Sequence, residues 1–351
     1  MKTAVALSGG MDSLASLLML HSSGNDLLPF HARFFPEKDT DTELNLKKIC
    51  NDLGLRLHII DLSQEFEQLI IRPFIDAYLS GLTPNPCALC NRKIKFGLIF
   101  DQIKTLGAEY LATGHYARML DNNSKPSLWR GSDSNKDQSY FLSLVPPDIL
   151  GKIIFPLHQT TKKNAREYLS QKQISPPVRK ESNEICFIEN DYRSFIRSRL
   201  PSIPQQPGQI KTIQGKILGT HQGLWQYTQG QRRGLGIAHD YPLYVTGKDT
   251  KNNTLIVGSK NDTLTSTCQA GNLNIHIDPV QWPSEIVVQT RYRQKAGPAS
   301  VDFDHDLMKI EFYNPQEIPA PGQVAAVYSA QGQVLAAGII IQDQDTGYIT
   351  A

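Results

Sequence analysis

The first half of the chain alternates short apolar runs with longer segments whose apolar residues recur every three or four positions. The apolar runs predict buried strands at residues 2–7, 27–35, 55–60 and 109–113. The longer segments predict helices at residues 13–24, 40–54, 63–81 and 93–106. Strands that alternate with helices form parallel sheets covered on both faces, so we expect an α/β fold in this half.

The pattern changes near residue 200. Two further helices are predicted at residues 160–171 and 191–200, and residues 201–209 (PSIPQQPGQ) are uncharged and rich in Pro and Gln, as in a linker. Beyond them, short β-like segments with Gly, Asn and Asp turns dominate, and residues 243–258 and 324–340 have the pattern of hairpins. We expect a small antiparallel barrel or sandwich in this last part of the chain.

Length and composition indicate a globular protein of two or three domains. The chain has 351 residues, 40% of them hydrophobic and 20% charged, which excludes disorder, collagen and coiled coil as its main character. Its 36 basic and 34 acidic residues leave a net charge of +2. Any contact with a nucleic acid must therefore come from local basic patches.

The first residues resemble a signal peptide, because Lys2 precedes an apolar run. Ser8, Asp12 and Ser13, with the glycine pair between them, interrupt that run and favour a buried strand and helix. No stretch of about 18 apolar residues is present, so we expect no membrane span. Five cysteines are too few for a disulfide scaffold, so we expect a cytoplasmic protein with free thiols.

The hexapeptide SGGMDS (8–13) lies between the first predicted strand and the first predicted helix. Gly9 and Gly10 permit close backbone approach, and the N–H groups that open the helix favour an anion such as a nucleotide pyrophosphate. Asp12 is placed to help hold a Mg²⁺ ion that neutralises the phosphates. The motif is neither that of the phosphate-loop kinases nor that of the dinucleotide folds. The alternative is an ordinary glycine turn.

Cys87 and Cys90 lie in a proline-containing loop (TPNPCALCNRKIKFG, 83–97), in which we expect Cys90 or Asn91 to open a helix. A thiol at a helix N-terminus near cations has a lowered pKa and is more reactive. The spacing of the two cysteines also suits half of a zinc site. The sequence has no second pair of this spacing, and no two of its nine histidines show ligand spacing. A pair of unreactive loop thiols is the other alternative.

The remaining cysteines differ in their surroundings. Cys186, in KESNEICFIEN (180–190), lies where polar residues give way to apolar ones, which favours an accessible thiol over a half-buried structural one. Cys50 lies on the apolar face of its predicted helix and is expected in the core. Cys268 falls in the β-rich region, and we interpret it as structural or incidental.

These motifs resemble those of the bacterial tRNA-specific 2-thiouridylases, which belong to the PP-loop ATP pyrophosphatases. The resemblance extends in order over the whole chain. The matching stretches are ALSGGMDS (6–13), TPNPCALCNRKIKF (83–96), ATGHYAR (112–118), GSDSNKDQSYFL (131–142), ESNEICFIE (181–189), HQGLWQYTQGQRRGLGI (221–237), TRYRQ (290–294) and PGQVAAVY (321–328). SNKDQSYFL and the ICFIE cysteine are the most diagnostic pieces.

The resemblance implies a fold and a reaction. The fold is an N-terminal PP-loop parallel-sheet domain of the adenine nucleotide alpha hydrolase type, a small central domain and a C-terminal antiparallel β-barrel. We place these domains at residues 1–200, 201–263 and 264–351. The reaction replaces O2 of uridine-34, the wobble base of tRNA anticodons, with sulfur. ATP, with Mg²⁺, adenylates that oxygen, and a cysteine persulfide loaded by an upstream sulfur donor supplies the sulfur.

The resemblance also assigns roles to residues. Cys186 matches the cysteine that carries the persulfide, and Cys90 matches the one that resolves it, leaving a Cys90–Cys186 disulfide; their Cα atoms must then come within about 7 Å. The implied ATP-binding residues are Ala6, Leu7, Ser8, Gly9, Gly10, Met11, Asp12, Ser13, Ala32 and Gly114. The implied tRNA-binding residues are Asn85, Pro86, Cys87, His115, Lys136, Asp137, Gln138, Arg291, Tyr292 and Gln323.

Two stretches depart from the family pattern. Position 87 is Asp in some members and Cys here, which gives three thiols, Cys87, Cys90 and Cys186, that could hold a [4Fe–4S] cluster in a rival mechanism. The stretch RFFPEKDTDTE (33–43) differs from the tryptophan-containing segment of the family, which bears on the assignment of Ala32.

Two other functions compete with thiolation. A PP-loop amidating or lysine-ligating synthetase shares the adenylation step but needs no cysteine pair, and an RNA-binding protein that has lost catalysis needs neither. Basic residues that could contact RNA phosphates occur in clusters, and for most of them a solvated surface is the alternative. The clusters are Arg92, Lys93 and Lys95; Arg193, Arg197 and Arg199; Arg232 and Arg233; and Arg291, Arg293 and Lys295.

Overall fold

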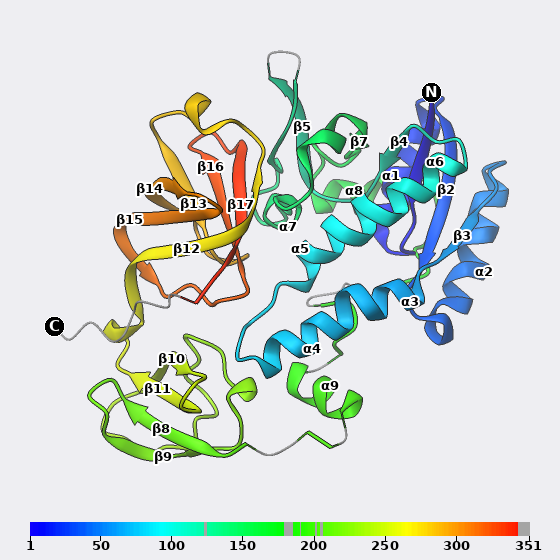
Figure 1. Ribbon diagram of the computed structural model, residues 1–351. Coiled ribbons are helices and arrows are strands. Elements are labelled where there is room, and N and C mark those ends of the chain that lie inside the picture. The colour runs from blue at the N-terminus through cyan, green and yellow to red at the C-terminus, as the bar shows by residue number, and fades with distance from the viewer. Residues whose placement is uncertain (123–124, 179–184, 190, 201, 204–205, 343–351) are drawn as a thin grey trace.

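The computed structural model describes residues 1–122, 125–178, 185–189, 191–200, 202–203 and 206–342 (Figure 1). Two predicted features lie partly outside these residues. They are the start of the ESNEICFIE stretch, residues 181–184, and residues 201 and 204–205 of the expected linker. The end of the third expected domain, residues 343–351, lies outside them as well.

The first half of the chain forms the predicted α/β domain around a parallel five-stranded sheet. Its strand order is β3-β2-β1-β4-β7, and each neighbouring pair is parallel. The strands are β1 (Lys2–Ala6), β2 (Asp26–Arg33), β3 (His58–Asp61), β4 (Tyr110–Ala112) and β7 (Ile153–Ile154). Since the chain runs outward from β1 to β3 and then returns to β4 on the other side, the topological switch point lies between β1 and β4.

Helices cover this sheet, and two of them are long and composite. The first runs through α3 (Ser63–Phe66), the π-helical segment η1 (Glu67–Ile71) and α4 (Arg72–Leu79). The second runs through α5 (Pro86–Cys90), the π-helical segment η2 (Asn91–Leu98) and α6 (Ile99–Thr105). The other helices of this half are α1 (Met11–Ser22), α2 (Pro36–Asp52), α7 (Ser139–Leu142), η3 (Pro147–Lys152), α8 (Lys162–Gln171) and α9 (Tyr192–Arg199).

The expected start of the cysteine helix is wrong. The helix begins at Pro86 rather than at Cys90 or Asn91, because Asn85 caps it by accepting a hydrogen bond from the Ala88 N–H at 3.1 Å. Proline is pre-organised for the first helical position and needs no partner for a missing N–H. Cys87 therefore lies in the first turn, and Cys90 lies just before the π-helical segment.

Strands β5 (Ala117–Asn122) and β6 (Lys125–Arg130), between β4 and β7 in the sequence, pair with each other. The chain beyond α9 is β-rich, as the sequence pattern predicts. A four-stranded sheet with the order β10-β11-β8-β9 follows α9. Its strands are β8 (Gly208–Thr212), β9 (Ile217–His221), β10 (Tyr244–Asp249) and β11 (Thr254–Gly258), with the short helical turns η4 (Leu224–Gln226) and η5 (Asn261–Thr263) around them.

The last sheet closes into a barrel in the order β12-β15-β14-β13-β16-β17, so the choice between barrel and sandwich is resolved. Its strands are β12 (Leu264–Ile275), β13 (Ile286–Gln289), β14 (Gly297–Asp304), β15 (Leu307–Glu317), β16 (Val324–Ser329) and β17 (Val334–Ile340), with the turn η6 (Pro279–Gln281). Figure 1 shows the barrel beside the α/β domain and the central sheet next to α4 and α9.

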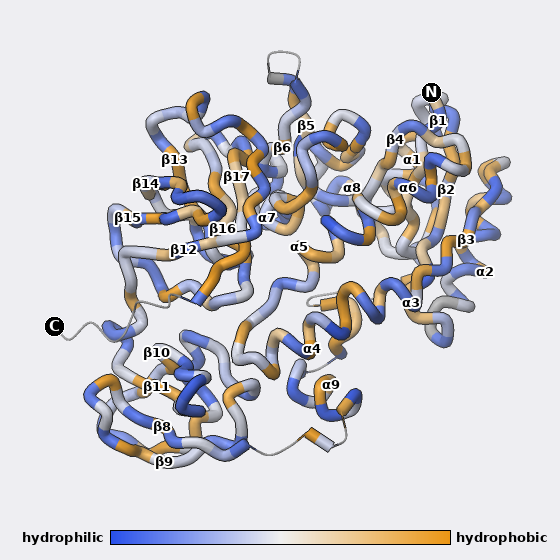
Figure 2. The backbone as a smooth tube through the Cα atoms, in the orientation of Figure 1, coloured by the Kyte–Doolittle hydropathy of each residue, from blue (hydrophilic) through white to orange (hydrophobic). Residues whose placement is uncertain are grey.

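One hydrophobic core continues from the α/β domain into the barrel. It joins Phe30 of the parallel sheet and Cys90 of the cysteine helix to Val324 and Tyr328 of β16. Figure 2 shows the hydrophobic residues of β17, next to β16 in the barrel. Because burial of apolar surface is the main stabilising contribution, this shared core holds the barrel against the α/β domain.

Candidate active site

The predicted phosphate loop follows β1 at the switch point of the sheet. Gly9 adopts φ +79°, a left-handed conformation that favours glycine, and Gly10 precedes the first turn of α1. The Ser13 hydroxyl donates to the Gly10 carbonyl oxygen at 2.8 Å and accepts from the Ser8 N–H at 3.2 Å. These bonds fix a turn at the N-terminus of a helix, which is the geometry that receives phosphate groups.

Asp12 is held by two residues that the sequence did not single out. Its carboxylate accepts a hydrogen bond from the Tyr116 hydroxyl at 2.8 Å and pairs with the Lys162 ammonium at 2.7 Å. Lys162 thus places a cation beside the phosphate loop from α8, far along the chain. The predicted contact of Asp12 with Mg²⁺ stays a prediction.

The loop after β4 packs directly against the phosphate loop. A Cβ atom added to Gly114 would lie 2.8 Å from the carbonyl carbon of Asp12 and 2.9 Å from the backbone nitrogen of Ser13. Only glycine allows this approach. The two loops that flank the switch point are therefore in contact, as expected for a nucleotide site. Ala32, half-buried on β2 opposite Ile60, lies on the neighbouring strand.

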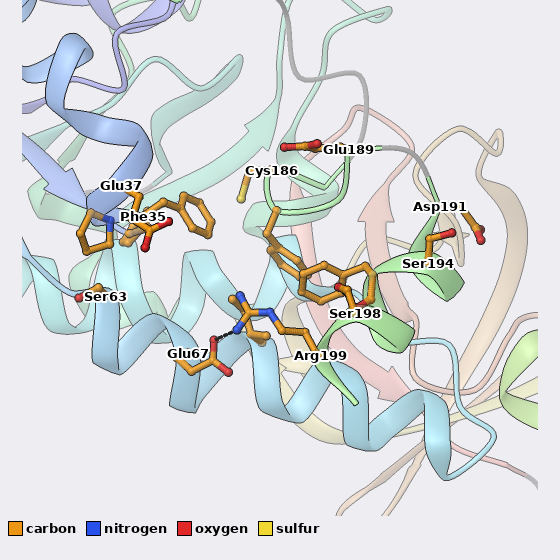
Figure 3. Close-up of a pocket in the computed structure, with 15 residues that line it drawn as sticks. Phe35, Glu37, Ser63, Glu67, Cys186, Glu189, Asp191, Ser194, Ser198 and Arg199 are labelled. Atoms are coloured by element: carbon orange, nitrogen blue, oxygen red, sulfur yellow. Dashed lines mark hydrogen bonds and ion pairs between the residues drawn. The ribbon is translucent and has the colours of Figure 1, made fainter. Parts of the chain in front are cut away.

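The thiols of Cys87, Cys90 and Cys186 lie close enough to interact electrostatically. The charges of Cys87 and Cys186 both act on the Cys90 thiol, and the ammonium of Lys95 acts on all three. Cys90 is 8% exposed and Cys87 half-buried, whereas Cys186 is exposed and points its sulfur into a pocket that it lines (Figure 3). Cys90 and Cys186, which lie 96 positions apart in the sequence, are thus close enough for their charges to interact, and the approach of their Cα atoms to within about 7 Å stays a prediction.

The expectation of a lowered thiol pKa is wrong. Burial raises the pKa of Cys90 to about 12 and that of Cys186 to about 11, and it also raises the pKa of Cys87. Lys95 opposes this shift at each thiol, but the loss of water outweighs it. The thiols are therefore mainly protonated in this conformation, and Lys95 is the group that favours their ionised form.

A short hydrogen-bonded chain holds Lys95. Its ammonium lies 3.3 Å from Nε2 of His115, and Nδ1 of His115 lies 2.8 Å from the Thr113 hydroxyl. An ammonium only donates, so Nε2 accepts and the ring proton resides on Nδ1. Burial, with the nearby Lys95 charge, keeps the pKa of His115 well below its ordinary value. His115 is buried here, and its predicted contact with tRNA stays a prediction.

Hydrogen bonds from the barrel hold the loop that leads into the cysteine helix. The Gln323 amide donates to the carbonyl oxygens of Thr83 at 2.9 Å and Pro84 at 3.1 Å, and the Thr83 N–H donates to Pro321 at 2.7 Å. These bonds give Gln323 a structural role, and its predicted contact with tRNA stays a prediction. Tyr292, also from the barrel, packs against Phe141 with ring centroids 4.3 Å apart.

The predicted tRNA-contacting triplet Lys136, Asp137 and Gln138 lies partly inside the protein. The Asp137 carboxylate is buried and accepts from Arg130, from the Gly131 N–H and from Ser139. The Gln138 side-chain oxygen accepts from the Tyr116 N–H at 3.0 Å. Their contacts give both residues a structural role, and their contact with tRNA stays a prediction.

The basic clusters differ in whether their side chains bond other parts of the protein or are exposed. Arg193 and Arg197 bond Gln226 of the central domain, so this cluster joins domains. The exposed residues Arg232 and Arg233 of the central domain and Arg291, Arg293 and Lys295 of the barrel remain available to RNA phosphates.

A phosphate loop at the switch point of a parallel sheet, with a cysteine cluster linked to it through His115 and Gly114, defines a PP-loop enzyme that handles sulfur. Family models match the whole arrangement: a tRNA methyl transferase HUP domain at residues 1–190, a tRNA methyl transferase PRC-barrel domain at residues 193–259 and an aminomethyltransferase beta-barrel domain at residues 265–340.

Relatives identify the family more closely. The chain is 48% identical over 349 residues to the tRNA-specific 2-thiouridylase MnmA of Nitratidesulfovibrio vulgaris (strain Miyazaki F), covering 97% of this chain and 99% of that protein. It is 44% identical to MnmA of Lawsonia intracellularis, covering 98% and 100%. The chain belongs to the family of tRNA-specific 2-thiouridylases.

Likeness to solved structures is weaker. The U34-tRNA thiolase NcsA from Methanococcus maripaludis with its [4Fe-4S] cluster is 18% identical with a TM-score of 0.36, covering 57% of this chain and 65% of that one. None of the helices in the described part of the chain has the length and apolar character that crossing a membrane requires.

Proposed function

We propose that this protein uses ATP to replace O2 of uridine-34 in tRNA anticodons with sulfur, with Cys186 as persulfide carrier and Cys90 as resolving thiol. The observation that supports this most strongly is that neighbouring groups link the thiols to the phosphate loop. The Lys95 charge acts on the Cys90 thiol, and the Lys95 ammonium lies 3.3 Å from Nε2 of His115. Gly114, next to His115 in the chain, packs against the backbone of Ser13 in the phosphate loop. Adenylation and sulfur transfer can therefore take place around one bound base.

The first step makes the oxygen a leaving group. O2 of the uridine attacks the α-phosphorus of ATP, pyrophosphate departs, and O2 becomes esterified to AMP. The phosphate loop and the Lys162 cation beside it stabilise the negative charge of the triphosphate. We propose that a Mg²⁺ ion accompanies the ATP and neutralises its phosphates.

The second step delivers sulfur. The outer sulfur of the Cys186 persulfide attacks C2 of the uridine, and AMP leaves with the oxygen. The Cys90 thiolate then attacks the inner sulfur of Cys186, which releases 2-thiouridine and forms a Cys90–Cys186 disulfide. A reductant reopens that disulfide, and an upstream donor restores the persulfide. A reducing cytoplasm is the setting that suits the five free cysteines.

The rival iron–sulfur mechanism receives no support from the geometry. Within the residues that the structure describes, no three His, Cys, Asp or Glu side chains converge closely enough to hold a metal ion. Cys87, Cys90 and Cys186 share an electrostatic environment but do not form a ligand set in this conformation.

The test is mass spectrometry of nucleosides from unmodified tRNA incubated with the protein, ATP, Mg²⁺ and sodium disulfide. The Cys186 thiolate takes one sulfur atom from the disulfide ion and releases hydrosulfide, which forms the persulfide without an added oxidant. We expect 2-thiouridine at position 34. Cys90→Ser and Cys186→Ser should abolish it, and Cys268→Ser, in the barrel, is the matched control that should not. Cys87→Asp restores the residue of other members and should remain active. Unchanged uridine at position 34, or undiminished thiolation by Cys186→Ser, would contradict our proposal.

A further inference from the structure

Thr113, Gly114 and His115 follow one another directly after β4, and they contact two different parts of the site. Gly114 packs against the phosphate loop. The side chains on either side of it meet each other, with the Thr113 hydroxyl 2.8 Å from Nδ1 of His115. Both side chains are buried, Thr113 at 4% exposure and His115 at 8%. No step of the proposed reaction uses the Thr113 hydroxyl, so its place next to His115 calls for another role.

The two hydrogen bonds of His115 determine which ring nitrogen carries the proton. The Lys95 ammonium lies 3.3 Å from Nε2 and can only donate, so Nε2 accepts. The ring proton is then on Nδ1, where the Thr113 hydroxyl oxygen accepts it. In a neutral imidazole the bond made by one nitrogen sets the state of the other. Thr113 thus keeps Nε2 unprotonated and able to accept from Lys95.

Aromatic side chains enclose the ring of His115. The ring centroids of Phe96 and Phe155 lie 5.9 Å and 6.1 Å from that of His115. Burial, with the nearby Lys95 charge, keeps the pKa of His115 well below its ordinary value. A protonated ring would carry N–H groups at both nitrogens and would repel the ammonium. The apolar surroundings therefore keep His115 in the neutral form that can hold Lys95.

Lys95 depends on such a partner for its place. A lysine has a flexible four-carbon stem and a strongly hydrated ammonium, which turns toward water when no buried group accepts from it. Lys95 is half-buried, and its charge opposes the effect of burial at each of the three thiols. This interaction weakens as the distance between the charges grows. The position of the ammonium therefore decides how strongly it favours the thiolates.

We propose that His115 and Thr113 are positioning residues for the thiol chemistry. His115 directs the Lys95 ammonium toward the three thiols, and the Thr113 hydroxyl makes this possible by fixing the tautomer of the ring. The inference rests on the proposed function, in which Cys90 must react as a thiolate. The three residues after β4 then serve both halves of the reaction, with Gly114 at the phosphate loop and its two neighbours at the thiols.

The test compares Thr113→Val, which removes the hydroxyl, with Thr113→Ser, which keeps it. The readout is the rate of iodoacetamide alkylation at Cys186 between pH 7 and pH 10, followed by peptide mass spectrometry. We expect Thr113→Val to react about threefold more slowly, since a displaced ammonium keeps part of its effect, and Thr113→Ser to react like the wild type. Thr254→Val, at a buried threonine of β11 whose hydroxyl donates to Asn252 at 3.1 Å, is the matched control and should also react like the wild type.

The double variant with Lys95→Met and Thr113→Val separates positioning from damage to the fold. If Thr113 acts through Lys95, its hydroxyl has nothing to direct once the ammonium is gone. The double variant should then react at the same rate as Lys95→Met alone. Damage at Thr113 would instead slow the reaction by the same factor with or without the ammonium. An equal factor in both backgrounds, or a wild-type rate in Thr113→Val, would overturn the inference.

Nitrogen-15 NMR of protein labelled at histidine tests the tautomer directly. The ring signals that disappear in His115→Gln should show a proton on Nδ1 in the wild type and on Nε2 in Thr113→Val. A proton on Nε2 in the wild type, or one that stays on Nδ1 in Thr113→Val, would overturn the inference.

Neither measurement needs ATP or tRNA, so the two proposals can fail separately. If Thr113→Val reacts like a wild type that does thiolate tRNA, only the positioning role fails. If the wild type forms no 2-thiouridine, the proposed function fails, whatever the alkylation rates.

Discussion

Replacing Lys95 by Met should slow every reaction of the three thiols. The Lys95 ammonium lowers the pKa of each thiol against the effect of burial. Loss of one such cation raises a neighbouring thiol pKa by about one unit, or about 1.4 kcal/mol. With a pKa of about 11, about one Cys186 thiol in a thousand is ionised at pH 8. In Lys95→Met we expect about one in ten thousand, and hence about tenfold slower alkylation.

The assay is the rate of iodoacetamide alkylation at Cys90 and Cys186, measured by peptide mass spectrometry between pH 7 and pH 10. The log of each rate should rise with pH with unit slope, and the Lys95→Met line should lie parallel and lower. Lys95→Arg keeps the charge and should stay close to the wild type. Cys50, buried in another core, is an internal reference. An unchanged rate at Cys186 in Lys95→Met, or an equal loss in Lys95→Arg, would refute the electrostatic reasoning.

Three further predictions follow from contacts elsewhere in the site. Gly114→Ala should abolish tRNA-dependent ATP–pyrophosphate exchange while the protein stays folded, because the added Cβ would meet the Ser13 backbone nitrogen at 2.9 Å; unchanged exchange would contradict this. Gln323→Leu removes two hydrogen bonds, worth about 1 kcal/mol each, from the loop at Thr83. It should slow thiolation several-fold and leave ATP–pyrophosphate exchange unchanged. If the variant only binds tRNA more weakly, Gln323 contacts RNA directly. Burial lowers the pKa of Lys248 to about 8. Between pH 8 and about 10.4 the unfolded chain therefore binds more protons than the folded protein, and the free energy of unfolding should rise with pH. Thermal unfolding should show this rise in the wild type and a flatter profile in Lys248→Met.

The alternation of elements was predictable because hydrophobic periodicity is local. The strands and helices of the first half depend on apolar residues that repeat within each element, and the hairpin at residues 324–340 has its turn signal in the sequence. Closure of the barrel was not predictable. It depends on the pairing of β12 with β17, in which Ala270 lies opposite Ile340, and a sandwich strand has the same alternation of side chains.

The chemistry of the thiols was only half predictable. The sequence shows Lys95 close to Cys90 along the chain, which suggests a lowered pKa. It does not show that the hydrophobic core closes around Cys90, which reverses the shift. Nor does any local signal mark Lys162, which reaches Asp12 from 150 positions away. Tertiary burial and long-range ion pairs are the physical reasons for both failures.

The barrel belongs to the catalytic unit rather than serving only as an RNA-binding attachment. Gln323 fixes the loop before the cysteine helix, and the buried Tyr140 hydroxyl donates to the carbonyl oxygen of Val324 at 2.9 Å. The core that contains Cys90 also contains Tyr328 of the barrel. A displacement of the barrel would therefore move the N-terminus of the cysteine helix and the thiols on it. Substitutions in β16 that loosen this core should thus impair sulfur transfer before they impair ATP binding, which depends on the phosphate loop after β1 in the parallel sheet.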